Sequence, residues 1–184
     1  MLEAQQVLDE VRGDVGLLLW QSLRDVTLWA ATAPERREGL FSPDAAARRL
    51  QHLLAAGAEP AVEVSLTTLT AVVGNPAAAS GEIVSLVCLQ LSRWAEARSH
   101  PGTAIAFSQG AALASPQDAS AAHAVGSLAL RWRRHARAET WLRRAIGLAR
   151  RGSDWAAYAQ AYVDLGTLYA RRGAAGPAQR YFVQ

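Results

Sequence analysis

The side chains of this sequence best suited to metal or acid–base chemistry are its histidines, and their spacing argues against both. His52, His100, His123 and His135 fall in four different expected helical segments. No two of them have the three- or four-residue spacing that places ligands on one helix face. The closest two, His123 and His135, are twelve residues apart, and no Cys or acidic residue completes a ligand set. We therefore expect no metal site.

The single cysteine and one glycine-containing turn offer no other catalytic chemistry. Cys88 lies in the apolar run "IVSLVCLQL" with no His or Cys close in sequence to activate its thiol, so we expect a small core residue. A lone cysteine also cannot form an intrachain disulfide. The turn "VVGNPAAASGE" lacks the Lys-Ser/Thr pair of a phosphate-binding loop. We predict a non-enzymatic protein without catalytic residues or cofactors.

An arginine-rich cluster, "RWRRHARAETWLRR", covers residues 131–144. Arginine beside aromatic rings suits nucleic acid, because guanidinium groups meet phosphates and rings stack on bases. Trp141 and Leu142, however, fall on the expected buried face, and Trp132 falls near an expected helix turn, where a large ring closes the core. We favour this structural interpretation. An acidic protein or peptide partner comes second, and nucleic acid is least favoured.

Composition and charge limit the partners and the cellular location that we expect. The chain has 184 residues, half of them hydrophobic, and its 19 basic residues are all arginine. Residues 131–184 carry a net charge of +8 and residues 1–130 carry −5, so the C-terminal half could attract an acidic partner. Acidic residues at Glu3, Asp9 and Glu10 replace the basic start of a signal peptide, and "VGLLLW" is interrupted from Gln21 onward. We expect a cytoplasmic protein without a membrane partner.

The elements that position these residues are predicted to be helices throughout. Abundant alanine favours helix, while Val, Ile and Thr seldom alternate with polar residues. The first helix is expected over about residues 2–31, weakened at Gly13 and Gly16. Ser42-Pro43-Asp44 is a helix start signal with a hydroxyl N-cap, Gly57 a left-handed cap, and Pro60 another start, with a break at 74–76. Six further helices are expected over 81–98, 103–114, 117–134, 137–151, 155–171 and 175–184.

The last two of these helices carry a pattern of large and small residues at Tyr162, Leu165-Gly166, Tyr169, Ala178 and Phe182. Two helices pack closely when one presents a small residue where the other presents a large one. This pattern resembles the tetratricopeptide repeat, counted from Ala159. Weaker copies start at Ser85 and Ala119; the latter has Val125-Gly126, Ala138 and Leu142 in register, and both lack the expected rings.

The resemblance implies an all-α fold of stacked antiparallel helix pairs forming a right-handed superhelix. We expect one helical array over residues 1–184, with degenerate capping helices over 1–80 and repeats over 85–184. Gln184 falls halfway through a second helix. The apolar face of that helix pair would then be partly uncovered, so we expect the natural polypeptide to continue past Gln184. The alternative is a homo-oligomer, in which a second copy of the chain covers this end.

The resemblance also implies a peptide-binding groove lined by the first helix of each pair. Carried over by repeat position, the groove residues are Leu89, Arg93, His123, Ser127, Leu130, Arg131, Gln160, Val163, Thr167 and Arg171. Their mixture of arginine, amide, hydroxyl and aliphatic groups suits an extended peptide or an acidic helix. Leu89 and His123 stand where chaperone-binding members carry part of their carboxylate clamp, so binding of chaperone tails is disfavoured.

These observations predict an interaction scaffold that holds a protein or peptide segment in its groove. The alternative is the helical sensor or oligomerisation region of a larger bacterial transcription regulator, because many such regulators carry similar arrays beside a DNA-binding domain. Direct binding of RNA or DNA by the arginine-rich half is a third and weaker hypothesis.

Overall fold

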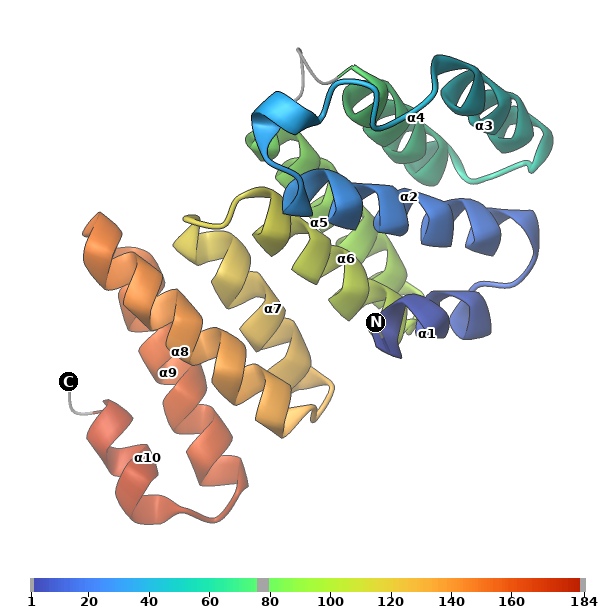
Figure 1. The fold of residues 1–184 in the computed structure, drawn as a ribbon. Coiled ribbons are helices and arrows are strands. Elements are labelled where there is room, and N and C mark those ends of the chain that lie inside the picture. The colour runs from blue at the N-terminus through green and yellow to red at the C-terminus, as the bar shows by residue number, and fades with distance from the viewer. Residues whose placement is uncertain (1, 76–79, 183–184) are drawn as a thin grey trace. The chain divides into compact units, whose positions relative to one another are not determined.

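The computed structural model describes residues 2–75 and 80–182, and it is helical with no strand in those two ranges (Figure 1). The elements in chain order are α1 Leu2–Glu10, α2 Gly13–Ala31, a short 3-10 helix η1 Pro34–Arg36, α3 Pro43–Ala55, α4 Pro60–Gly74, α5 Gly81–Ala97, α6 Pro101–Ala114, α7 Ala119–Arg131, α8 His135–Gly152, α9 Trp155–Arg171 and α10 Ala175–Phe182. The predicted all-α class is confirmed. Expectations about Pro76, in the break after α4, and about Gln184 lie outside the described residues.

Local start and stop signals place most helix ends. Pro43, Pro60 and Pro101 each stand in the first turn of a helix, where a missing N–H costs nothing. Gly57 follows α3 with φ +61°, the left-handed conformation expected there. The expected hydroxyl N-cap is wrong, because the Ser42 side chain makes no capping hydrogen bond to any residue that the structure describes.

The expectation of one long helix over residues 2–31 is also wrong. The chain breaks between Glu10 and Gly13, and Gly13 has φ +74°, which side chains disfavour. At Gly16, any Cβ would overlap the carbonyl oxygen of Val11, so only glycine permits this sharp return. The two pieces share one apolar periodicity, but the turn lets α1 pack against both α2 and α6.

The helices belong to two compact units, Met1–Ser115 and Pro116–Gln184, called unit 1 and unit 2 here. In unit 1, α6 contacts α1, α2 and α5, while α4 contacts α2, α3 and α5. In unit 2, α8 packs on α7 and α9, and α10 packs on α9. Figure 1 shows consecutive helices running antiparallel within each unit. The single array expected from the sequence stays a prediction.

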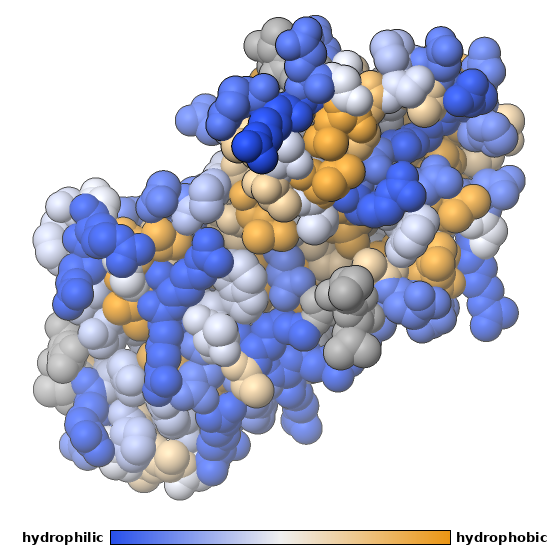
Figure 2. Space-filling view, in the orientation of Figure 1, coloured by the Kyte–Doolittle hydropathy of each residue, from blue (hydrophilic) through white to orange (hydrophobic). Residues whose placement is uncertain are grey.

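The core of unit 1 is built mainly from α2, α4, α5 and α6, with Val7 of α1 and Leu53 of α3 added. Its largest fully buried side chains include Leu19, Trp29, Leu66, Leu91 and Phe107. Cys88 is completely buried among them, as expected, and burial raises the pKa of its thiol to about 12. Hydrophobic side chains also reach the surface of this unit along α2, with hydrophilic groups between them (Figure 2).

Two charged side chains close helix ends of unit 1 across the fold. Glu10 of α1 accepts hydrogen bonds from the backbone N–H groups of Gly102 (2.8 Å) and Thr103 (2.7 Å), the positive end of α6. At the C-terminal end of α2, the Arg37 guanidinium donates to the carbonyl oxygens of Trp29 (3.0 Å) and Thr32 (2.9 Å). Both contacts satisfy helix-end groups that the helix itself leaves unpaired.

The predicted nesting of small and large residues recurs in the helix pairs of unit 2. Gly126 of α7 faces Leu142 of α8, and Gly166 of α9 faces Phe182 of α10. The second residue lies sixteen positions after the first in both cases. Gly166 is buried and Ala178 is 4% exposed, so the expectation that both small residues face the packed side is confirmed.

The α5–α6 pair of unit 1 has the same register with different chemistry. Ser92 stands where Gly126 and Gly166 stand, and its hydroxyl donates to the carbonyl oxygen of Ala104 across the pair (2.7 Å). Ser92 is 5% exposed, and Ser108, sixteen residues later, is 1% exposed. The Ser92 hydroxyl is buried between two helices and needs a partner, and the α6 backbone supplies it. Three helix pairs therefore close around a small residue at the equivalent position.

Candidate functional site

The sequence-predicted groove residues divide between the two units. Leu89 and Arg93 lie on α5 in unit 1, and the other eight lie on α7 and α9 in unit 2. Because α7 and α9 contact each other, unit 2 brings its share together on one surface. We define the α7–α9 face by the residues His123, Ser127, Arg131, Gln160, Val163, Asp164, Thr167 and Arg171.

Asp164 of α9 is the centre of this face, although the sequence analysis did not select it. Its Oδ2 lies 2.9 Å from His123 Nε2 on α7, and Ser127 makes a side-chain hydrogen bond to it. Arg131 Nη1 in turn donates to Ser127 Oγ (3.2 Å). The sequence contained one usable signal: Asp164 is the sole acid of α9 and follows Val163, which was selected.

The electrostatics at Asp164 favour its ionised form. Burial by itself would raise the pKa of the carboxyl. The hydrogen bonds from His123 and Ser127, and the charges of His123 and Arg131, outweigh that effect and hold the pKa below its usual range. Asp164 is therefore a charged acceptor that ties α7 to α9.

The presence of Ser, His and Asp side chains does not create a nucleophile here. In a catalytic triad the imidazole lies between the hydroxyl and the carboxylate, so that it can remove the hydroxyl proton. In this face the carboxylate of Asp164 lies between the other two groups, with both His123 and Ser127 bonded to it. The arrangement ties two helices together and places no imidazole next to the hydroxyl.

The remaining groove residues predicted on α7 and α9 differ in their contacts and exposure. Arg171 of α9 donates to the carbonyl oxygen of Leu130 on α7 (3.1 Å), which adds a second tie between the helices. The Leu130 side chain is 4% exposed and packs in the core of unit 2, so its predicted place in a groove is corrected. Thr167 bonds to its own helix through the Val163 carbonyl (2.9 Å), and the Val163 side chain is 48% exposed.

In unit 1, the exposed surface of α5 is more apolar than the two predicted groove residues on this helix indicate. Leu89 is half-buried against the core and Arg93 is exposed. Ile83 and Leu86 lie on the same helix and are 41% and 62% exposed. Leu86 occupies the second position of the repeat counted from Ser85, so the repeat numbering could have found it.

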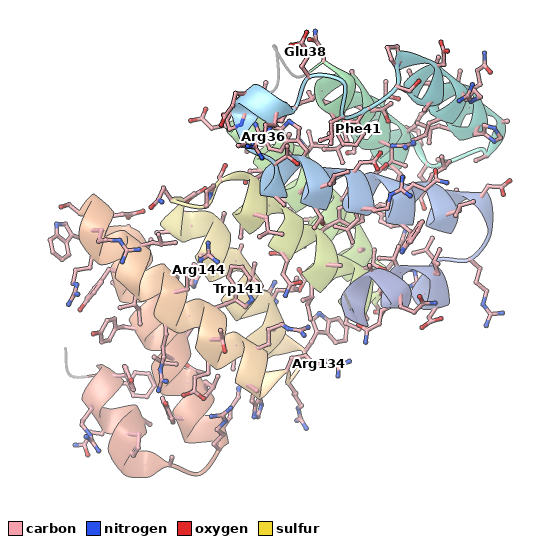
Figure 3. All side chains as sticks on the ribbon, in the orientation of Figure 1. Arg36, Glu38, Phe41, Arg134, Trp141 and Arg144 are labelled. Atoms are coloured by element: carbon pink, nitrogen blue, oxygen red, sulfur yellow. The ribbon has the colours of Figure 1, made fainter. Side chains whose placement is uncertain are left out.

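The arginine-rich cluster is largely occupied by contacts within unit 2. Trp141 packs against the core, and the guanidinium carbon of Arg144 lies 5.0 Å from its ring centroid (Figure 3). Arg143 pairs with Glu139 (2.8 Å) and donates to the Tyr169 hydroxyl (2.8 Å). Trp141 is partly buried and Arg144 lies over its ring, so these contacts favour the structural interpretation of the cluster.

Two kinds of site have no candidate among the described residues. Among them, no three His, Cys, Asp or Glu side chains converge as metal ligands. None of the described helices combines the length and apolar character needed to cross a bilayer.

The protein is all-α and consists of packed helix pairs. Two of its helices, α7 and α9, are tied together and form one surface with polar and apolar side chains. In comparisons with known proteins, no family model, curated protein or solved structure matches this chain.

Proposed function

We propose that this chain is a non-enzymatic interaction protein of the tetratricopeptide-repeat type, which binds a protein or peptide segment on the α7–α9 face. The observation that carries the proposal is the junction at Asp164. It holds first helices of successive pairs side by side, and their exposed residues form one surface. A surface prepared before binding loses little conformational entropy when a ligand arrives.

The chemistry of the face suggests an acidic segment with some apolar character. Val163 offers an exposed aliphatic contact between Gln160 and Thr167 along α9. Arg131 and Arg171 supply guanidinium groups at the C-terminal ends of the two helices, where they can meet carboxylates. The single acid of the face, Asp164, is already bonded to His123 and Ser127.

Its place in the cell belongs to the same proposal. We propose a cytoplasmic location with it. The exclusive use of arginine suggests a GC-rich, bacterial genome. Nucleic acid is the weaker partner, because Trp141 is covered by Arg144.

A peptide selection tests this proposal. Short random peptides selected on the whole chain should be enriched in Asp and Glu. Their binding should fall at least about tenfold in Val163→Asp and Arg131→Glu, since like charges would then face each other. Val64→Asp is the matched control, because Val64 is a valine of unit 1 that is 66% exposed. Enrichment of basic peptides, or equal loss in the control, would refute the proposal.

A further inference from the structure

Helix α2 presents an exposed stripe that the packing of unit 1 does not use. Leu17 and Leu28 are each 45% exposed, and Gln21 and Arg24 lie between them on the same side. Eleven residues separate the two leucines, which is about 16 Å along a helix and close to three turns. Figure 2 shows hydrophobic and hydrophilic surface side by side over α2.

Two adjoining hollows follow this stripe between α2 and α3. One has a volume of about 320 Å³ and the other about 240 Å³, and both are lined by Arg24, Ala45 and Arg49. The two hollows adjoin at these residues, and together we call them the α2–α3 groove. Its apolar lining includes Leu17, Leu18, Leu28, Leu40, Phe41 and Ala45, with Val73 of α4 at one side. Phe41, labelled in Figure 3, belongs to the connector before α3.

The groove exists because α3 has little to pack against α2. Over its whole described length α3 buries Leu53 alone, and the side chains that it contributes to both hollows are those of Ala45, which is small, and Arg49. An ion pair bridges the gap instead: Arg49 of α3 bonds to Asp25 of α2, whose side chain is 3% exposed. This pair keeps the helices apart while holding them at a fixed spacing.

The charged lining of the groove is biased toward positive. Arg24, Arg48, Arg49 and His52 line it, and the acids are Asp14 and Asp25. Arg49 neutralises the charge of Asp25, and Arg24, the second arginine near that carboxylate, has a side chain that is 59% exposed, so one positive charge is left over. Arg48 is an exposed cation on the α3 rim, beside an apolar floor. The surface is therefore complementary to a ligand with an apolar stripe and acidic flanks.

We propose that the α2–α3 groove binds an amphipathic, acidic helix of a partner protein. Leucines three turns apart on α2 match the spacing of apolar side chains on one face of a helix lying alongside, which is the helix-in-groove mode. Arg24 and Arg48 then meet carboxylates on the flanks of that helix. This surface lies within unit 1 and is independent of the α7–α9 face.

The test uses the whole chain and a labelled synthetic helical peptide. The peptide carries Leu at positions i, i+4, i+7 and i+11 and Glu on both flanks, and its binding is followed by fluorescence anisotropy. We expect the chain to bind it, and Arg48→Glu and Leu17→Ser each to weaken binding at least about tenfold. Arg180→Glu, the same charge change on α10, should leave affinity unchanged. Circular dichroism verifies that each variant keeps its helicity.

Several outcomes would overturn the proposal. Absence of binding by the wild-type chain would do so, as would equal binding of a peptide with Lys in place of Glu. Affinity that is unchanged in both groove variants would show that the peptide binds elsewhere. A single-stranded oligonucleotide that competes for the groove and loses affinity in Arg48→Glu would replace the protein partner by nucleic acid. Loss of binding only in Val163→Asp would assign the peptide to the α7–α9 face.

Discussion

Gly126 of α7 lies directly against Leu142 of α8, so closely that a Cβ at Gly126 would stand 2.7 Å from Leu142 Cγ. Gly166 has the equivalent relationship to Phe182, with a Cβ 2.6 Å from the ring. The two sites differ in what can move. Leu142 is fully buried and its backbone nitrogen is also close, whereas Phe182 is 53% exposed and meets Gly166 through the far end of its ring.

This difference predicts unequal costs of adding a methyl group. Gly126→Ala should destabilise the protein by about 1–2 kcal/mol, since overpacking exceeds the gain in helix propensity. Gly166→Ala should be close to neutral because the Phe182 ring can turn aside. Gly147→Ala on α8 is the control, because its nearest neighbour would be the end of Arg151 at 3.6 Å, and it should stabilise. Urea unfolding measures all three, and equal costs at Gly126 and Gly166 would contradict the packing.

The contact of Glu10 with the start of α6 predicts a second effect. Glu10→Ala removes the acceptor for the N–H groups of Gly102 and Thr103, and should lower the free energy of unfolding by about 1–2 kcal/mol. Glu10→Gln, which keeps one acceptor oxygen, should cost less. Asp9→Ala, an exposed neighbour, serves as the control in thermal unfolding. A loss in Asp9→Ala as large as in Glu10→Ala would show that the cap is unimportant.

The buried pair of Asp25 and Arg49 predicts non-additive substitutions. Arg49→Met leaves the Asp25 carboxylate buried with Arg24 as its remaining cation, and should cost about 2–4 kcal/mol. The double variant with Asp25→Leu should recover much of this loss, because the uncompensated charge is gone. Chemical denaturation of the two single variants and the double variant gives the coupling energy. Additive costs would mean that the two side chains do not interact.

The lowered pKa of Asp164 predicts a pH dependence with a definite sign. Since its folded pKa lies below the unfolded value of about 3.9, its contribution is fully present above that pH and disappears as the pH falls through the folded pKa. Asp164→Asn should therefore be less stable than the wild type at neutral pH, and the gap should shrink in strong acid. Urea unfolding across this range tests it, with Asp44→Asn, an exposed acid of α3, as the control. A gap that is constant with pH would contradict the role of the ionised carboxyl.

Much of the local structure could be predicted from the sequence because its causes are local. Proline in the first turn of α3, α4 and α6 needs no distant partner, and neither does the left-handed Gly57. The nesting of Gly166 with Phe182 was also predictable, since adjacent helices joined by a short turn pack on each other. The resemblance to tetratricopeptide repeats stays a prediction, together with the binding function that it implies.

The site depended on contacts that no local pattern contains. Asp164 was overlooked because its importance comes from His123 and Ser127, about forty residues earlier in the chain. Leu130 was selected by its repeat position, yet the packing of unit 2 buries it. The α2–α3 groove was equally hidden, because it results from the Asp25–Arg49 pair and the scarcity of bulky side chains on α3.

The sequence by itself therefore determined the class of fold and the position of most helices, because these follow from backbone propensity and periodicity over a few turns. Only the tertiary structure decided where the first helix breaks, which carboxylates are buried or paired, and which surfaces stay open. Glu10 reaches α6 across ninety-two residues of chain. Such contacts depend on how helices far apart in sequence come together, and each one contributes a free energy that no single segment encodes.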